Sequence, residues 1–240
     1  MNLLLAPQYL IPFGSNEWFK ASGTTFLLIA LVVGAGYFLT HSKKHSLGRF
    51  IGYFLLTVAI SAHVYLAYVN RWTLQDSLPL HLCGISGLLS GLVLLTRNQM
   101  MYECVLYWGL AGATHSLLTP DMPQGGEGYM YFEYYLQHGG IILAALYATI
   151  AMGMRPRKNS WLVVFGFSQI LMIVVGTANY LIGSNYMFLC ERPLVDNPLV
   201  IGKWPWYIIS FEVAAIVHFL LIYAPFWWIN KKKVATEISE

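Results

Sequence analysis

Charged residues are scarce in this sequence. Only 10% of its 240 residues are Asp, Glu, Lys or Arg, whereas 57% are hydrophobic, and the mean hydropathy is +0.56. A soluble domain carries about 25% charged residues, so this chain has too few to cover a water-exposed surface. We therefore infer a membrane protein, and the length suits about six to eight helices of roughly 20 apolar residues each.

Cysteine is also rare, and several motif classes are missing. The three cysteines, Cys83, Cys104 and Cys190, have no regular spacing, which argues against a disulfide framework and a Cys-x-x-Cys metal site. No basic patch with interleaved aromatic residues indicates a nucleic-acid partner, so we expect none. We find no internal repeat or low-complexity tract, so residues 1–240 are predicted to form a single transmembrane domain.

Apolar runs, interrupted by charges and turn residues, predict an all-α polytopic protein. Seven runs are long enough to cross a bilayer, the third and fourth only just. The predicted helices of this seven-helix bundle cover residues 20–40, 48–69, 79–96, 100–119, 131–153, 160–183 and 205–229.

Basic residues alternate between the two ends of these helices. Ten of the 14 Lys and Arg residues fall on one side: Lys43, Lys44, Arg49, Arg97, Arg155, Arg157, Lys158, Lys231, Lys232 and Lys233. The other four are Lys20, Arg71, Arg192 and Lys203. The positive-inside rule then places the N-terminus outside and the C-terminus in the cytoplasm, as an odd number of spans requires. We expect a multi-pass protein of the cell membrane.

Polar side chains within the spans gather at one depth. Following each helix in its direction of travel puts most of them in the outer half of the membrane: His63, His81, Cys83, His115, Glu133, Gln137, His138, Asn179, Tyr180 and Glu212. Glu103 and His218 are the exceptions. Ionisable groups within a bilayer usually face a bundle interior or a water-filled cavity. The pattern predicts an outward-facing polar cavity, although side chains close to an interface can also reach water by snorkelling.

His81 and Cys83 open the third apolar run but do not face each other on a helix. Residues two apart point about 200° from one another. Cys83 shares a stripe with Gly87, Ser90 and Gly91, so it is either a small packing residue or a nucleophile. His81 is either a core histidine that hydrogen-bonds across helices or part of a catalytic site.

A cysteine nucleophile needs a base, and His138 is the best candidate because it approaches from the same side. Glu212 could orient a histidine. Asn179, Asn185 and Tyr186 could donate hydrogen bonds to an oxyanion, and Gln137 could contact substrate.

Two other readings use the same residues. Three of His63, His81, His115 and His138 could hold zinc and leave one open position, as in a zinc-dependent lipid hydrolase. Alternatively, the cavity could bind or transport a small polar ligand without catalysis.

Several segments resemble the YwaF-type family of bacterial integral membrane proteins, over about residues 45–229. They are Leu78-Pro-Leu-His-Leu-Cys83, Tyr107-Trp-Gly-Leu110, Gln137-His-Gly139, Asn185-Tyr-Met-Phe-Leu-Cys190, and Trp204-Pro-Trp-Tyr207 followed by Glu212. That family is similar to a eukaryotic transmembrane acyltransferase acting on ether phospholipids and, more distantly, to androgen-induced intramembrane hydrolases of fatty-acid esters.

The resemblance implies an intramembrane lipid acyltransferase or acyl hydrolase, with Cys83 as nucleophile and His138 as base. It implies membrane lipids as partners and no cofactor. In the eukaryotic acyltransferase the cysteine directly precedes a histidine, whereas the order here is His81-Leu-Cys83. An alignment on the histidine places Leu80 at the nucleophile position, so Cys83 and His81 both remain candidates for the essential residue. The acyl chain, its acceptor and the oligomeric state are left open.

Overall fold

The computed structural model describes residues 9–122, 126–193 and 200–239, and the side chains of the last helix up to residue 231. Within these residues the chain is helical apart from short connections and one two-stranded ladder. The expected all-α class is therefore confirmed. The ladder pairs β1 (Tyr9–Leu10) with β2 (Asp121–Met122) in an antiparallel manner.

Helical segments occupy each of the predicted spans. Their bounds are α1, η1 and α2 (Asn16–Trp18, Phe19–Gly23 and Thr24–Phe38), α3 (His41–Tyr68), α4 (Leu82–Thr96), α5, η2 and α6 (Gln99–Cys104, Val105–Ala113 and Thr114–Leu118), α7 and η3 (Gly128–Leu146 and Tyr147–Ala151), α8 (Ser160–Ile182) and α9 (Trp206–Ser239). A short 3₁₀ turn, η4 (Tyr186–Phe188), lies between α8 and α9. The segments η1, η2 and η3 are π-helical stretches that continue the flanking α-helices.

Four of the described helices are long and apolar enough to cross a membrane by themselves: Asn16–Phe38, His41–Tyr68, Ser160–Ile182 and Trp206–Lys231. The apolar helix Leu82–Thr96 is shorter. The segments from Gln99 to Leu118 and from Gly128 to Ala151 contain the π-helical stretches η2 and η3. The protein is thus a multi-helix membrane protein, and the count of seven crossings remains a prediction.

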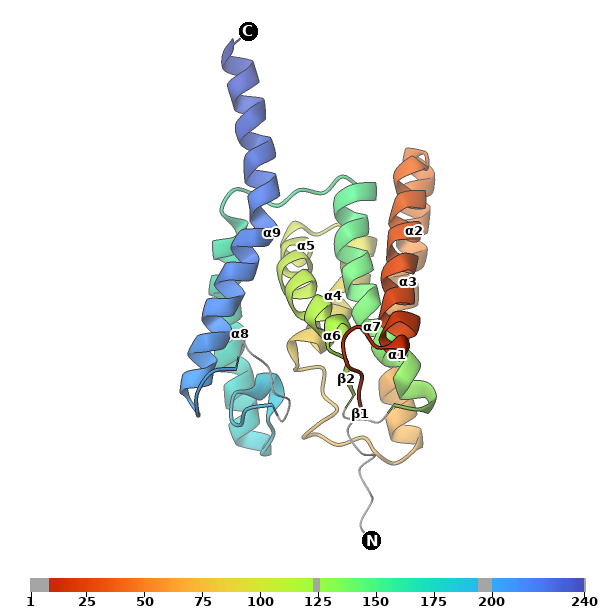
Figure 1. Cartoon of the computed structure of the whole chain (residues 1–240), viewed down its shortest axis with the longest axis vertical. Coiled ribbons are helices and arrows are strands. Elements are labelled where there is room, and N and C mark those ends of the chain that lie inside the picture. Colours follow the sequence, from red (N-terminus) through yellow and green to blue (C-terminus); the bar gives the residue numbers. More distant parts are fainter. Residues whose placement is uncertain (1–8, 123–125, 194–199, 240) are drawn as a thin grey trace.

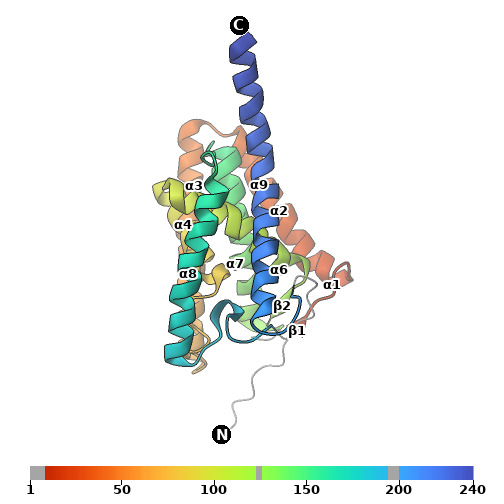
Figure 2. The same ribbon diagram turned by 90° about the vertical axis from the view of Figure 1, so that its left-hand side faces the viewer.

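The helices divide into a tightly packed group and a flanking pair. Helices α3, α4 and α7 pack against one another, α4 and α7 also pack against η2, and α2 packs against α7. The flanking pair, α8 and α9, stands at the left of Figure 1 and meets the group through α5 and η2. Seen from the left, α8 and α9 lie in front of this group (Figure 2). The fully buried core, including Tyr102, Tyr107, Trp108 and Tyr147, lies in the group and at its border with the pair.

Two glycines allow the closest helix contact. A Cβ built on Gly91 of α4 would lie 2.8 Å from the carbonyl oxygen of Gly52 on α3, and one built on Gly52 would lie 2.9 Å from that of Gly91. No side chain fits between backbones at that separation. Small residues at a helix interface are a common solution in membranes, where apolar lipid tails provide no hydrophobic driving force for association.

An ion pair between a buried carboxylate and an exposed arginine lies at the end of the molecule where the basic residues gather. Glu103 of α5 is fully buried and accepts hydrogen bonds from Gln99 Nε2 at 2.9 Å and from the Arg157 backbone N–H at 2.8 Å. The Arg157 side chain completes the pair at 2.6 Å. The carboxylate raises the pKa of Arg157, which lies in the connection between η3 and α8. The pair joins α5 to that connection.

Candidate functional site

Cys83 lies in the first turn of α4, beside side chains from α6 and α7. Its thiol contacts the hydroxyl of Ser116, and a Cβ built on Gly112 of η2 would lie 3.7 Å from Cys83 Sγ. The hydroxyl of Tyr134 on α7 donates to the Ser116 carbonyl oxygen at 2.8 Å. The Tyr134 ring packs against His138, with 4.3 Å between ring centroids. We call Cys83, Ser116, Tyr134 and His138 the Cys83 cluster.

Hydrogen bonding fixes the tautomer of His138. Its Nδ1 lies 2.7 Å from the carbonyl oxygen of Tyr134. A carbonyl oxygen can only accept, so Nδ1 carries the proton and Nε2 of the neutral ring is an acceptor. His138 is buried, with 7% of its surface exposed. Its environment therefore favours the neutral ring with the lone pair on Nε2, which is the form that a general base requires. No direct hydrogen bond between Cys83 and His138 is present in the described part of the chain.

Asn179, near the end of α8, holds the loop that follows it. Its side-chain Nδ2 donates to the Tyr186 carbonyl oxygen at 2.9 Å, and its Oδ1 accepts from the Tyr186 backbone N–H at 2.9 Å and from Ser184 Oγ at 2.7 Å. Asn179 is 1% exposed and Tyr186 is fully buried. The asparagine amide thus binds both backbone groups of a buried residue, whose carbonyl oxygen also accepts from the Leu189 N–H at 3.5 Å.

His81 binds the same loop from the other side. It is the residue immediately before α4, and its Nδ1 accepts a hydrogen bond from the Met187 backbone N–H at 3.2 Å. Its ring packs against Tyr186 and Phe188, at centroid distances of 5.2 Å and 5.4 Å. Met187 and Phe188 have φ of 57° and 54°. Non-glycine residues in this left-handed region are strained, and such strain persists where the surroundings fix the backbone.

The polar groups of Asn185 and Tyr186 form hydrogen bonds with backbone atoms of the protein. Asn185 Nδ2 donates to the Glu191 carbonyl oxygen at 2.9 Å, and its Oδ1 accepts from the backbone of Cys190 and Glu191, at 3.0 Å each. Tyr186 Oη accepts from the Leu78 N–H at 2.8 Å and donates to the Leu74 carbonyl oxygen at 2.9 Å. Burial raises the pKa of Tyr186. We call His81, Asn179, Asn185 and Tyr186, with the loop that they hold, the Asn179 cluster.

The start of α9 closes this cluster. Tyr207 Oη donates to the Phe188 carbonyl oxygen at 2.6 Å, and Trp204 Nε1 donates to that of Leu189 at 3.0 Å. The segments 78–83, 185–190 and 204–207 therefore meet at one place. Because His81 belongs to the Asn179 cluster and Cys83 to the Cys83 cluster, the first residues of α4 join the two.

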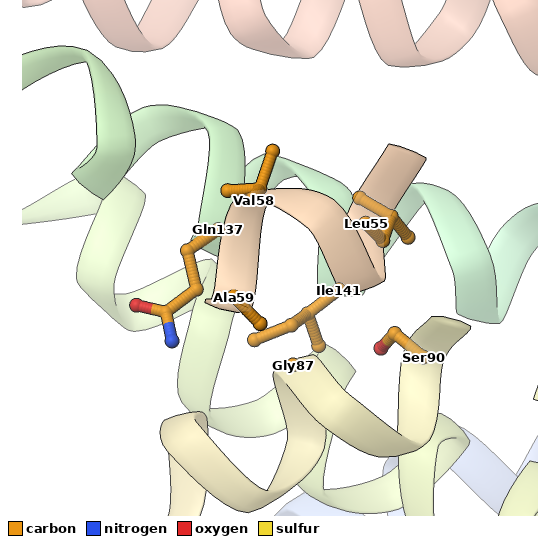
Figure 3. A pocket seen from close by; sticks show the side chains of 7 residues that line it. All are labelled: Leu55, Val58, Ala59, Gly87, Ser90, Gln137 and Ile141. Carbon is orange, nitrogen blue, oxygen red and sulfur yellow. The ribbon is translucent and has the colours of Figure 1, made fainter. Parts of the chain in front are cut away.

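Gln137 borders a small pocket rather than either cluster. The pocket holds about 10 Å³ and lies between α3, α4 and α7; its lining also includes Gly87 and Ser90 (Figure 3). This volume fits about one water molecule. Gln137 Nε2 is 3.4 Å from a Cβ built on Gly87, so the amide packs against the backbone of α4.

Glu212, His63 and His115 each contact a different partner. Glu212 of α9 accepts from Gln169 of α8 at 2.6 Å and touches neither cluster through a hydrogen bond among the described residues. His63 accepts from Trp72 at 3.4 Å, and His115 Nε2 lies 2.9 Å from His218 Nε2. The four histidines considered for zinc thus have separate environments. Within residues 9–122, 126–193 and 200–231, no three His, Cys, Asp or Glu side chains approach closely enough to hold a metal ion.

Sequence reasoning missed Tyr134 and Ser116. Tyr134 precedes His138 by four residues, so the helical repeat alone places both on one face of α7 and could have identified it. Ser116 had no such signal, because its contact with Cys83 joins α6 to α4. The His115–His218 pair also depends on a contact between distant segments, α6 and α9.

Comparison with known proteins supports a shared family. A 22% identical protein of Treponema pallidum (strain Nichols), described as uncharacterized, aligns over 219 residues, which is 90% of each chain. No solved structure matches the chain. The model of the TMEM164 family matches residues 13–223. This range includes both clusters, the helices from α1 to α8, and about the first half of α9. The chain therefore belongs to the TMEM164 family.

Proposed function

We propose that this protein is an intramembrane lipid acyltransferase or acyl hydrolase in which Cys83 is the nucleophile and His138 the base. The observation that carries the proposal is the Cys83 cluster, which gathers a thiol and a histidine with an accepting Nε2 around Tyr134. The segments that resemble the YwaF-type family, which is similar to a eukaryotic phospholipid acyltransferase, support the choice of lipid esters as substrates.

The chemistry needs two transfers of the acyl group. In the first, His138 Nε2 takes the thiol proton, Cys83 Sγ attacks the ester carbonyl carbon, and the carbon–oxygen bond breaks. The imidazolium returns its proton to the leaving alkoxide, and a thioester remains on Cys83. In the second, an acceptor hydroxyl gives its proton to His138 and attacks the thioester, which expels the Cys83 thiolate. The imidazolium then protonates this thiolate, which restores the thiol and the neutral His138. A lipid acceptor gives acyl transfer, and water gives hydrolysis.

The other candidate residues then have supporting roles. The donors of Asn179, Asn185 and Tyr186 already bind backbone atoms, so the Asn179 cluster positions the start of α4 rather than binding an oxyanion. His81 is a positioning residue in this arrangement. Gln137 and Glu212 remain candidates for substrate contact, through an outward-facing cavity that opens when lipid enters. Seven crossings and an external N-terminus complete the proposed arrangement.

Trapping the thioester tests the proposal. The purified full-length protein, in nanodiscs that contain diacyl phospholipid, should acquire an acyl mass on the peptide that contains Cys83, and hydroxylamine should remove it. Cys83→Ala should abolish both the adduct and lipid turnover. Cys104→Ala is the matched control, because Cys104 is buried in α5 at the other end of the helices, and it should keep both.

A second variant tests the base. His138→Ala should slow thioester formation by about 10²–10⁴-fold, the usual loss when general-base catalysis is removed. Full lipid turnover by Cys83→Ala would overturn the nucleophile assignment. Saturable ligand binding or uptake with no turnover would instead indicate a binding or transport protein.

A further inference from the structure

A basic pocket opens at the end of the molecule opposite the Cys83 cluster. It holds about 330 Å³ and lies between the first turns of α3 and the end of α4. Its polar lining consists of His41, Ser42, His45, Arg49 and Arg97. Figures 1 and 2 show that the α2–α3 connection lies at the end from which α9 projects. This end carries most of the basic residues and is the predicted cytoplasmic side.

The basic side chains converge in the pocket. The Nε2 atoms of His41 and His45 are 3.1 Å apart, and Arg97 Nη1 lies 3.5 Å from His45 Nε2. The lining includes no carboxylate. In the part of the chain that the structure describes, neither Arg49 nor Arg97 forms a salt bridge. The two guanidiniums are held at one pocket without a counter-charge, so they repel one another, and an anion would relieve that repulsion.

The backbone of Arg97 adds an independent observation. This residue ends α4 with φ of 54° and ψ of 30°, and its N–H donates to the Val93 carbonyl oxygen at 2.8 Å. That left-handed position is usually taken by glycine, and an arginine there costs free energy. The strained residue places a guanidinium in the lining of the pocket, which is the pattern expected where function fixes a residue.

The remaining surroundings fit an amphiphile. Leu94 and Leu95 supply the apolar part of the lining. On α3, Phe50 and Tyr53 follow Arg49 within about one turn and are 69% and 63% exposed. A phosphate among the arginines and histidines would therefore have apolar surface beside it, along which acyl chains could lie. Basic pockets between membrane helices on the cytoplasmic side are known to bind lipid head groups.

We propose that this pocket binds the phosphate monoester head group of an anionic phospholipid. The two guanidiniums can each donate two hydrogen bonds to phosphate oxygens, and the imidazoles and Ser42 can donate further ones. The site is separate from the proposed acyl-transfer chemistry, and it can be tested by binding alone.

Native mass spectrometry of the full-length protein in detergent tests the assignment. Dioctanoyl phosphatidic acid should bind at least about tenfold more tightly than dioctanoyl phosphatidylcholine, since only the former carries a net negative head group near −1.5 to −2 at neutral pH. Arg49→Gln and Arg97→Gln should each reduce this affinity by about tenfold or more. Lys43→Gln is the matched control, because it removes the same charge from the same first turns of α3 without lining the pocket, and it should change affinity less than about threefold.

The outcomes separate the alternatives. Equal binding of the two lipids, or an equal loss with Lys43→Gln, would overturn the pocket as a specific site. Inorganic phosphate should compete only weakly, and competition as strong as that of phosphatidic acid would overturn the lipid assignment in favour of a soluble phosphate compound. Thermal unfolding of each variant shows whether it folds. Arg49 does not cap a helix, so Arg49→Gln keeps the test valid if Arg97→Gln is unstable.

Discussion

Replacing Asn179 by alanine should loosen the loop between α8 and α9. The substitution removes three hydrogen bonds and leaves the backbone N–H of the buried Tyr186 without its partner. The Tyr186 carbonyl oxygen keeps the longer bond from the Leu189 N–H, at 3.5 Å. An unsatisfied buried polar group costs about 1–3 kcal/mol, so we expect a loss of about 3 kcal/mol in the free energy of unfolding. For a chain of this size that corresponds to a fall of about 6–12 °C in Tm.

Thermal unfolding in detergent, followed by tryptophan fluorescence, would measure this fall. Amide hydrogen exchange would show whether protection is lost first at residues 183–190, which the three bonds hold. Thr177→Ala is the matched control: Thr177 is exposed on the same helix, and its hydroxyl bonds the Ile173 carbonyl oxygen one turn earlier, at 2.8 Å. A Tm within about 2 °C of the wild type, with unchanged exchange, would refute the assignment of Asn179 as the residue that holds this loop.

Three further predictions concern packing, the ion pair of the buried Glu103, and topology. Gly91→Ala should lower the free energy of unfolding by about 1–3 kcal/mol in the same assay, because its Cβ would overlap α3, whereas Gly166→Ala, with open space around it, should not lower it. Arg157→Ala should lower the free energy of unfolding by about 1–3 kcal/mol because it weakens the pairing of the buried Glu103. Lys158→Ala should change it by no more than about 0.5 kcal/mol, and an equal loss in both variants would contradict the ion-pair argument. In intact cells, a tag at the N-terminus should be accessible to an impermeant reagent, and a tag at the C-terminus should not. The reverse pattern would remove the basis for placing the Cys83 cluster on the outer side.

Sequence alone determined where the helices run. The apolar runs are long and the breaks between them contain charges, so most predicted spans and observed helical segments coincide closely. Two helices are longer than predicted: α9 ends at Ser239 rather than residue 229, and α3 begins seven residues before its predicted span, at His41 rather than residue 48. That difference has a local reason: Lys43, Lys44 and Arg49 interrupt the apolar run without interrupting a helix, because they lie where the chain reaches the interface. Hydropathy reports burial in lipid, whereas helices continue wherever backbone hydrogen bonds can form.

Tertiary structure decided which polar residues meet. The sequence grouped His81, His138, Asn179 and Glu212 by depth, but depth does not specify the direction of a side chain around its helix axis. Packing placed His81 with Asn179 through a shared loop, and it placed His138 with Tyr134. Glu212 faces Gln169 instead.

The same limit explains the residues that sequence reasoning missed. Ser116 reaches Cys83 because α6 and α4 both pack against η2 and α7, and Arg97 reaches His45 because α4 packs against α3. Neither contact leaves a periodic or spacing signal, since each depends on where two distant segments come together. Local sequence determines the helices and their polar ends, and only the packing of one helix against another determines which of those ends form a site.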